Sequence, residues 1–462
     1  MARPYLPLLA LAACYDPGYT DATRCGPAGE CPAGRRCAGD VCVASDAATG
    51  PRLILDKAAG ATGTGRVTAR FLDCPGTCTH AETALTGDQV VLTALPDPGS
   101  FFQGWSGACV GPYRRCTVTG GGVQGVEARF SAMTHNLVFA TEASVDGDFG
   151  GAEAGDAMCA AAAEEAGLSG PFVAFLGRTG GPAAPGRLVL PGTSTPARGF
   201  MRLDGEPVAD RVEDLTLSNR VWNAVAFDQN GQLHEGPVWT GTELLGAPSP
   251  FNCLGWSDNT SGYFGISGHA SAGPRFNVTG ATECNLAASV YCFGVGKNLP
   301  LAAPAPAAGK LIFVTHATLP ARSSAGYQTA QDLCDAEGNL PAVRALLATQ
   351  GQRASRFLVA GATYVRPDGV IVGTGSEIMG GELRSGVWQE SDGTYSVAAG
   401  VWTGSGSVGA LEQFAQPSCG SWTTTTGMGV VGSLESHATC WWFTGNEDCS
   451  DVDTYAVYCV EP

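Results

Sequence analysis

The fold is decided by Pro237-Val-Trp-Thr-Gly-Thr242, Asn252-Cys-Leu-Gly-Trp256 and Val290-Tyr-Cys-Phe293, because each of these strings recurs in a similar form later in the chain. The second versions are Gly400-Val-Trp-Thr-Gly-Ser405, Ser418-Cys-Gly-Ser-Trp422 and Val457-Tyr-Cys-Val460. Two earlier strings recur in the same order, Leu137-Val-Phe-Ala-Thr141 as Leu311-Ile-Phe-Val-Thr315 and Arg202-Leu-Asp-Gly205 as Arg366-Pro-Asp-Gly369. Matches kept in one order indicate an internal duplication. We therefore expect two domains of one kind, copy 1 (residues 133–294) and copy 2 (residues 310–462), joined by a Pro/Ala linker at 295–309.

Cysteines recur at matching places in the two copies. Each copy is predicted to open with a strand and a helix, 152–166 around Cys159 and 328–336 around Cys334, and then to become rich in strands and loops. An outer disulfide from helix to last strand, Cys159–Cys292 or Cys334–Cys459, closes nearly the whole copy and is worth about 4–5 kcal/mol. Inner pairs are expected at Cys253–Cys284 and Cys419–Cys449. Cys440 is either a free buried thiol or the partner of Cys419 in place of Cys449.

This layout resembles the endostatin-like branch of the C-type lectin-like fold, and more closely an uncharacterised bacterial family of lipoprotein-associated domains. The resemblance rests on Cys159, Val238-Trp-Thr-Gly241, Cys253-x2-Trp256, Gly265, Cys284 and Tyr291-Cys292. It implies an α+β fold, rich in strands, with one or two helices in each copy. A shared fold does not by itself carry a shared function.

Residues 51–132 alternate apolar and polar side chains in short runs between turn residues, which predicts a small antiparallel all-β domain. The string Phe101-Phe-Gln-Gly-Trp-Ser-Gly-Ala-Cys109, with Cys74-Pro-Gly-Thr-Cys78 and Cys116, resembles the divergent internalin-B-type bacterial repeat. That resemblance implies a β-rich spacer of the kind found in surface proteins and adhesins. We expect local pairs Cys74–Cys78 and Cys109–Cys116, one of three possible connectivities.

The N-terminus has the form of an export signal. Residues 1–13 hold one basic residue and an apolar run, and Leu11-Ala-Ala-Cys14 resembles a bacterial lipobox, which predicts lipidation of Cys14 and a membrane anchor. An ordinary signal peptide is the alternative. Residues 14–50 form a cysteine-rich segment and linker, in which two cross-links of open connectivity are expected among Cys25, Cys31, Cys37 and Cys42. Zinc on these four cysteines is the alternative.

Composition agrees with export and argues against several classes of protein. The 462 residues include 18 cysteines, which indicate disulfides and an oxidising compartment. A formal net charge of −17, from 26 Lys and Arg against 43 Asp and Glu, disfavours nucleic acid as a partner. No apolar run of spanning length follows the N-terminus, so no transmembrane helix is expected.

Motifs for chemistry are missing from the sequence. Neither copy has the loop set that C-type lectins use for calcium, and no two of the six histidines have the spacing of a zinc helix. Asp146-Gly-Asp148 and Asp156 fit turns and a helix N-terminus better than a calcium loop. No nucleophile elbow or phosphate loop is present, so we expect no catalytic residue, no metal and no cofactor.

The remaining candidate residues are four tryptophans beside turns: Trp239, Trp256, Trp402 and Trp422. An aromatic ring at a turn can face a sugar or a protein, although packing around the inner disulfide is the favoured interpretation. A binding surface is expected in the loops between Trp239 and Cys284 and between Trp402 and Cys449.

The sequence thus predicts an exported, lipid-anchored protein at the cell surface or the periplasmic face of the bacterial envelope. Its expected function is non-catalytic binding or adhesion to an unknown extracellular glycan or protein, with two weak sites on one chain adding avidity. A structural envelope component is the alternative, and a secreted hydrolase is less favoured.

Overall fold

The structure is a computed structural model. It describes residues 25, 31, 35–38, 41–44, 51–85, 89–111, 113–119, 121–178, 180–216, 220–319, 326–337, 342–381, 383–396, 398, 400–411, 417–434, 436, 439–450 and 455–462. The predicted signal at 1–13, Cys14 and the linker after Ala44 lie outside the described residues. The chain divides into two compact units, residues 1–97 with 104–130, and residues 98–103 with 131–462. Both copies therefore fall within the second unit.

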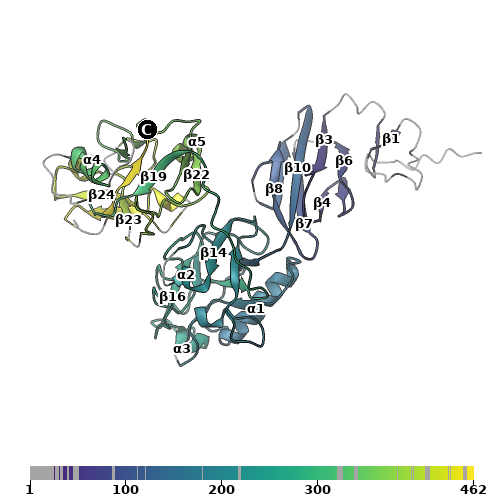
Figure 1. Ribbon diagram of the computed structural model, residues 1–462, viewed down its shortest axis with the longest axis horizontal. Coiled ribbons are helices and arrows are strands. Elements are labelled where there is room, and N and C mark those ends of the chain that lie inside the picture. Colours follow the sequence, from purple (N-terminus) through teal and green to yellow (C-terminus); the bar gives the residue numbers. More distant parts are fainter. Residues whose placement is uncertain are drawn as a thin grey trace, which may run out of the picture. The chain divides into compact units, whose positions relative to one another are not determined.

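The first unit contains a two-stranded hairpin and two four-stranded sheets, drawn in purple and blue in Figure 1. The sheet orders are β6-β3-β10-β8 and β5-β4-β7-β9. Leu53 and Leu55 on β3 are fully buried while the residues between and beside them are not, which is the two-residue period of a strand covered on one face. The strands are β1 (Arg35–Ala38), β2 (Val41–Ala44), β3 (Arg52–Lys57), β4 (Gly65–Ala69), β5 (Leu72–Cys74), β6 (His80–Ala84), β7 (Gln89–Pro96), β8 (Ser100–Gly107), β9 (Arg115–Thr119) and β10 (Val123–Ala132).

Copy 1 is built on one mixed sheet of order β14-β13-β11-β18-β15-β16-β17, with β12 added on β18 (teal in Figure 1). A long helix, α1, follows the first strand and packs against β12. The elements are β11 (Asn136–Ala140), α1 (Ala152–Glu165), β12 (Phe172–Ala174), β13 (Arg198–Met201), β14 (Pro207–Arg211), α2 (Val212–Thr216), β15 (Pro237–Trp239), α3 (Cys253–Trp256), β16 (Phe264–His269), β17 (Gly280–Glu283) and β18 (Ser289–Gly294).

The central strands of this sheet are buried on both faces. On β11, Leu137 and Phe139 belong to the core cluster that contains α1, whereas Val138 and Ala140 belong to a second cluster. Strand β18 alternates in the same way and is buried throughout. A strand that is covered on both faces has a continuous run of apolar residues in its sequence. Leu137-Val-Phe-Ala140 is such a run, so the sequence predicted a strand there.

Copy 2 repeats copy 1 element by element (green to yellow in Figure 1). Its sheets have the orders β20-β27-β19-β21-β22 and β25-β24-β23-β26, and β26 and β27 together take the place of β18. The elements are β19 (Lys310–Val314), α4 (Tyr327–Ala336), β20 (Arg344–Ala345), β21 (Thr363–Val365), β22 (Ile371–Thr374), α5 (Gly375–Gly380), β23 (Gly400–Trp402), α6 (Cys419–Trp422), β24 (Met428–Gly432), β25 (Gly445–Asp448), β26 (Tyr455–Ala456) and β27 (Tyr458–Val460). The prediction of a multidomain, β-rich chain with few helices is confirmed.

The two copies contact each other through a buried tryptophan and a buried arginine of copy 2. The indole of Trp388 packs on Ala224 and Ala226, and its Nε1 donates to the Val221 carbonyl at 3.1 Å. Arg366, fully buried, donates from Nη2 to the Trp222 carbonyl at 2.8 Å. Desolvated aromatic and arginine groups of this kind dominate interface energies.

The segment between the copies is attached at both ends. The Leu301 amide donates to Asp210 Oδ1 at 2.7 Å in copy 1, and the Ala307 amide donates to the Gly369 carbonyl at 3.0 Å in copy 2. The Pro/Ala composition of residues 295–309 suggests a semi-rigid spacer. In the structure, backbone amides of this segment are hydrogen-bonded to the copies on either side of it.

Candidate functional site: the loop end of copy 1

Each copy carries a left-handed turn beside its inner disulfide. In copy 1 this turn is α3, with φ angles of 48° at Cys253, 52° at Leu254, 77° at Gly255 and 70° at Trp256. An L-residue in the left-handed region costs roughly 1–2 kcal/mol. Three non-glycine residues with this conformation in a run of four make the turn a strained element, and strain of this kind concentrates at functional sites.

Several contacts impose the conformation of the turn. Asn252 caps it, its Oδ1 accepting from the Gly255 amide at 2.8 Å. The Trp256 side chain is fully buried, and its Nε1 donates to the Gly177 carbonyl at 3.0 Å. Cys253 is tied to Cys284. Because the residues on either side of it are anchored inward, Leu254 is directed outward and is 63% exposed.

Leu254 belongs to a set of exposed apolar side chains, which we call the loop-end patch. Its members share an origin in the segments joined by the inner disulfide, and their exposed fractions run from 38% to 63%. They are Phe251, Leu254, Tyr263, Phe264 and Leu286. They lie on neighbouring backbone segments, and exposed apolar side chains on neighbouring segments indicate an interaction surface more strongly than the same residues scattered over the molecule.

Backbone hydrogen bonds hold the segments of the patch together. The Ile266 amide donates to the Phe251 carbonyl at 2.8 Å, and the Cys284 amide donates to the Tyr263 carbonyl at 2.9 Å. Phe264 pairs with Glu283 across β16 and β17. The patch is therefore displayed on a cross-linked, hydrogen-bonded framework, which limits the entropy lost when a ligand orders it.

Copy 2 has the same turn without the patch. The bridges Asn252–Gly265 in copy 1 and Ser418–Gly429 in copy 2 align the two loop ends. Pro417, Gly420, Gly427 and Met428 then stand opposite Phe251, Leu254, Tyr263 and Phe264. The counterpart of Leu286 lies outside the described residues. Within the described part of copy 2, the loop end thus keeps the scaffold and loses most of the apolar surface.

Carboxylates outnumber basic side chains on the segments that carry the patch. Asp146, Asp148, Asp258 and Glu283 lie on the segments that border it, with Asn259 Nδ2 donating to Asp146 Oδ2 at 3.1 Å. No Lys or Arg occurs from residue 221 to residue 274. Arg178, which follows the Gly177 carbonyl that accepts from Trp256 Nε1, is paired with Glu153 at 3.1 Å. Among the described residues, none of the four carboxylates forms an ion pair, so acidic groups are in excess on the segments that carry the patch.

The four tryptophans singled out from the sequence lie in the core and not at the surface. Trp239, Trp256 and Trp402 are fully buried and Trp422 is 1% exposed. Trp239 packs against Trp256 with ring centroids 5.6 Å apart, and the Trp402–Trp422 pair repeats the arrangement at 5.5 Å. No indole face is open to a ligand, so their role is to support the turns from beneath.

The structure forms the disulfides expected in both copies. The outer bonds are Cys159–Cys292 and Cys334–Cys459, and the inner bonds are Cys253–Cys284 and Cys419–Cys449. Cys440 is an unpaired thiol, and it is exposed where a buried one was considered. Its place is on a short 3-10 segment, Thr439–Trp441, whose tryptophan side chain points into the core instead.

The first unit also forms the local pairs Cys74–Cys78 and Cys109–Cys116. In the cysteine-rich segment the connectivity is Cys25–Cys37 and Cys31–Cys42. Three of these sulfurs, from Cys25, Cys31 and Cys42, lie within 4.8 Å of one another. All three are engaged in disulfides, whereas a zinc site requires thiolates.

A hydroxyl–imidazole contact in copy 1 escaped the sequence analysis. Ser289 Oγ lies 2.8 Å from His234 Nε2 and 3.2 Å from Ser144 Oγ. Burial lowers the pKa of His234, against the opposing charge of Glu142. Ser289 is fully buried, and a nucleophile must reach its substrate. The contact therefore satisfies the buried hydroxyl of Ser289 with the half-buried imidazole of His234.

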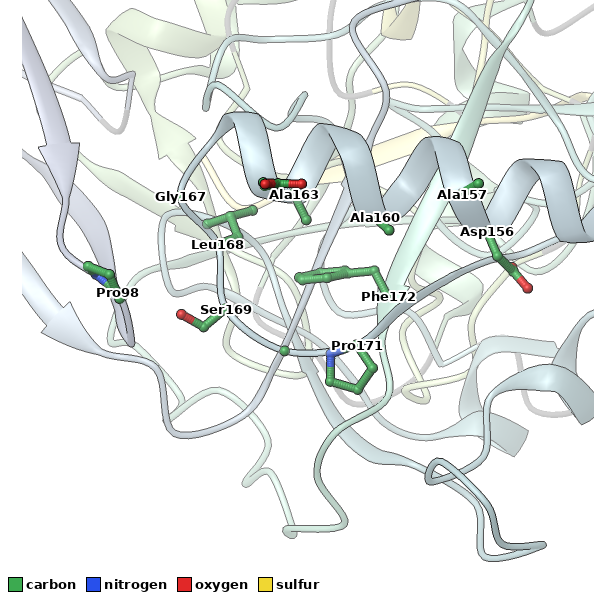
Figure 2. Close-up of a pocket in the computed structure, with 12 residues that line it drawn as sticks. Pro98, Asp156, Ala157, Ala160, Ala163, Gly167, Leu168, Ser169, Pro171 and Phe172 are labelled. Atoms are coloured by element: carbon green, nitrogen blue, oxygen red, sulfur yellow. The ribbon is translucent and has the colours of Figure 1, made fainter.

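A cavity of about 660 Å³ lies beside α1 (Figure 2). Figure 2 shows Ala157 and Ala160 of α1 on one side and Pro171 and Phe172 on the other. Asp156, at one end, accepts from the Ala174 amide and pairs with Arg187 at 2.7 Å. This places Asp156 in a structural ion pair within copy 1 and accounts for it without calcium.

Comparison with known proteins assigns one part of the chain. The family model of the divergent InlB B-repeat domain matches residues 59–134. The match begins inside the predicted β-repeat domain, residues 51–132, and ends two residues after it. No curated protein matches the chain. The eight disulfides between described cysteines fit an oxidising, extracytoplasmic compartment. Among the described helices, none has the length and apolar character needed to span a bilayer.

Proposed function

We propose that the chain is a lipid-anchored surface protein that binds an extracellular partner, glycan or protein, through the loop-end patch of copy 1, without catalysis. In this proposal Cys14 carries the lipid, and the cysteine-rich segment and the β-repeat act as a spacer. Both copies are endostatin-like domains of the C-type lectin-like fold. The observation that carries the proposal is an exposed apolar surface held on a strained turn that buried tryptophans and a disulfide support.

The asymmetry between the copies supports a dedicated binding end. The two loop ends share the turn, its polar cap and its buried tryptophan, so these features serve the fold. Exposed Leu254 and Tyr263 serve nothing inside copy 1, and their counterparts Gly420 and Gly427 show that the scaffold does not need them. Apolar groups kept at the surface lose free energy in water unless a partner covers them. In this proposal the chain has one site, in copy 1, instead of the two weak sites expected from the duplication.

An array of glycans and matrix proteins, probed with the full oxidised chain with and without EDTA, tests the proposal. We expect binding that survives EDTA and is lost in the variant Leu254→Gly/Tyr263→Ser/Phe264→Met. A matched control is Met428→Ala at the copy 2 loop end, which should bind like the parent chain. Binding that EDTA abolishes, or that the triple variant retains, would contradict the patch as the site.

Lipid attachment has a separate test. Growth with a labelled fatty acid should place the label on the parent chain and not on Cys14→Ser. Label retained on that variant would overturn the anchor and leave the binding site untouched.

A further inference from the structure

We infer that the loop-end patch takes a cationic, apolar polypeptide segment, in which Lys or Arg side chains alternate with apolar ones. The inference rests on the proposed function, because it names the ligand class of the same site. It is carried by the combination of exposed apolar side chains with an unpaired acidic border.

The apolar part of the patch selects for hydrophobic side chains. Leu254 and Leu286 are aliphatic and more than half exposed, so a ligand that removes them from water must itself supply apolar surface. A sugar could stack on the rings of Phe251, Tyr263 or Phe264 but would leave the aliphatic Leu254 and Leu286 in water. Side chains of a polypeptide fit a mixed aliphatic and aromatic surface better.

The charged part of the patch selects for positive groups. Asp148 and Asp258 have no basic partner among the described residues, and Arg178 is already paired with Glu153. An anionic ligand would be repelled from this border, and a cationic one would be drawn to it. The rings of Phe251, Tyr263 and Phe264 add cation–π attraction for Lys or Arg side chains that reach over them.

The same charges disfavour a second copy of this chain as the occupant. Two loop ends that met face to face would bring their acidic borders together, and like charges in an interface are destabilising. Copy 2 offers no substitute, since Gly420 and Gly427 replace two members of the patch. One cationic segment per chain is the expected stoichiometry.

The test uses the full oxidised chain and three fluorescent peptides of about twelve residues, built on one alternating frame with Leu and Phe. The charged positions hold Lys in the first peptide, Ser in the second and Glu in the third. In fluorescence anisotropy we expect the Lys peptide to bind one-to-one and at least about tenfold more tightly than the Ser peptide, with no binding of the Glu peptide. Added salt should lower the affinity of the Lys peptide toward that of the Ser peptide, because screening removes the electrostatic contribution to binding.

Two sets of variants separate the contributions. The double variant Leu254→Gly/Tyr263→Ser introduces the glycine that copy 2 has at the first position and a small residue at the second. It should lower the affinity for the Lys peptide about tenfold or more. The fold should stay intact, because Gly adopts the left-handed conformation of the turn without strain. Asp148→Asn/Asp258→Asn should lower affinity for the Lys peptide several-fold and leave the Ser peptide unchanged. Met428→Ala in copy 2 is the control and should change neither.

Failure of the inference can be told apart from failure of the proposed function. Equal binding of the Lys and Ser peptides that is lost in Leu254→Gly/Tyr263→Ser would overturn the cationic ligand and retain the patch as the site. Binding of the Lys peptide that all variants retain would overturn both. Absence of peptide binding, or self-association of the chain that the patch variant abolishes, would overturn the cationic segment.

Discussion

The two copies differ at two informative positions. On the left-handed turn, copy 1 has Leu254 and copy 2 has Gly420. At the contact between the copies, copy 2 has Trp388 at the position of Ala226 in copy 1. Beneath these differences the disulfides and the buried tryptophan pairs coincide. The pattern shows which residues the fold requires and which each copy has changed. Copy 1 alone presents the exposed apolar end, and copy 2 supplies the side chain that packs between the copies.

The largest effect should come from what the two copies share, the outer disulfide. Removing it as Cys159→Ala/Cys292→Ala or as Cys334→Ala/Cys459→Ala opens loops of 133 and 125 residues. The chain-entropy model predicts a loss of about 4–5 kcal/mol in the free energy of unfolding in either case. Denaturant unfolding followed by tryptophan fluorescence measures it. A loss in only one copy would mean that the scaffolds are not equivalent.

The next largest effect should come from the contact between the copies. Trp388→Ala removes a fully buried indole and its hydrogen bond to the Val221 carbonyl, and it should destabilise the chain by about 3 kcal/mol or more. The matched change Ala226→Trp places a second indole where Trp388 already packs and should destabilise by overpacking. Calorimetry of the full chain measures both. If Trp388→Ala unfolds like the parent chain, the copies are not held together by this side chain.

Much of this comparison could be read from the sequence, because its signals are local. The duplicated strings, the cysteine positions and the apolar run at Leu137–Ala140 predicted the repeated elements, and the helices end within a residue of the predicted bounds. Trp239 and Trp402, which the sequence offered as binding residues, are core, whereas Phe251 and Tyr263 in the predicted binding loop of copy 1 are exposed.

Other features depended on pairing over long distances, which a sequence pattern does not encode. The Ser289–His234 contact joins residues 55 positions apart, and the Trp388–Val221 bond joins residues 167 positions apart. One local signal was available for the patch. Tyr263-Phe264 follows the polar run Ser257-Asp-Asn-Thr-Ser-Gly262, so an apolar pair stands next to a turn.

A smaller effect is expected at the helix of each copy. Asp156 of copy 1 accepts from the Ala174 amide at 2.8 Å and pairs with Arg187, whereas Gln331 of copy 2 accepts from the Ala345 amide at 3.1 Å. Asp156→Gln copies the residue of copy 2 and removes the carboxylate from a guanidinium that is 11% exposed. We expect a loss of about 1–2 kcal/mol in chemical unfolding.

The reverse change in copy 2, Gln331→Asp, removes the amide group that donates to Asp335 Oδ1 at 2.8 Å and to the Val343 carbonyl at 2.9 Å. It also places a second carboxylate beside Asp335, so it should destabilise the chain as well. Unchanged stability in Asp156→Gln would contradict the ion pair with Arg187 as a stabilising contact.

The smallest expected effect is the pH dependence of stability, which should have opposite sign at one histidine of each copy. Burial lowers the pKa of His234 in copy 1 below 6.5, partly offset by the charge of Glu142. In copy 2, the hydrogen bond from His316 Nδ1 to Glu390 at 2.5 Å and the charge of that carboxylate raise the pKa of His316 above 6.5, with smaller contributions from Glu337 and Asp392. His316 stands where copy 1 has Glu142.

The two histidines must therefore act in opposite directions. The folded state binds fewer protons at His234 than the unfolded chain does, so this histidine reduces stability as the pH falls through 6.5 toward its lowered pKa. The folded state binds more protons at His316, so its stabilisation is fully present below 6.5 and is lost as the pH rises through the raised pKa. Unfolding at about pH 5.5 and about pH 8 distinguishes them. His316→Gln should destabilise the chain more at the lower pH, and His234→Gln should destabilise it more at the higher pH. If both variants change in the same direction, burial at His234 and the carboxylate at His316 do not control the two sites as described, because only opposed pKa shifts give opposed slopes.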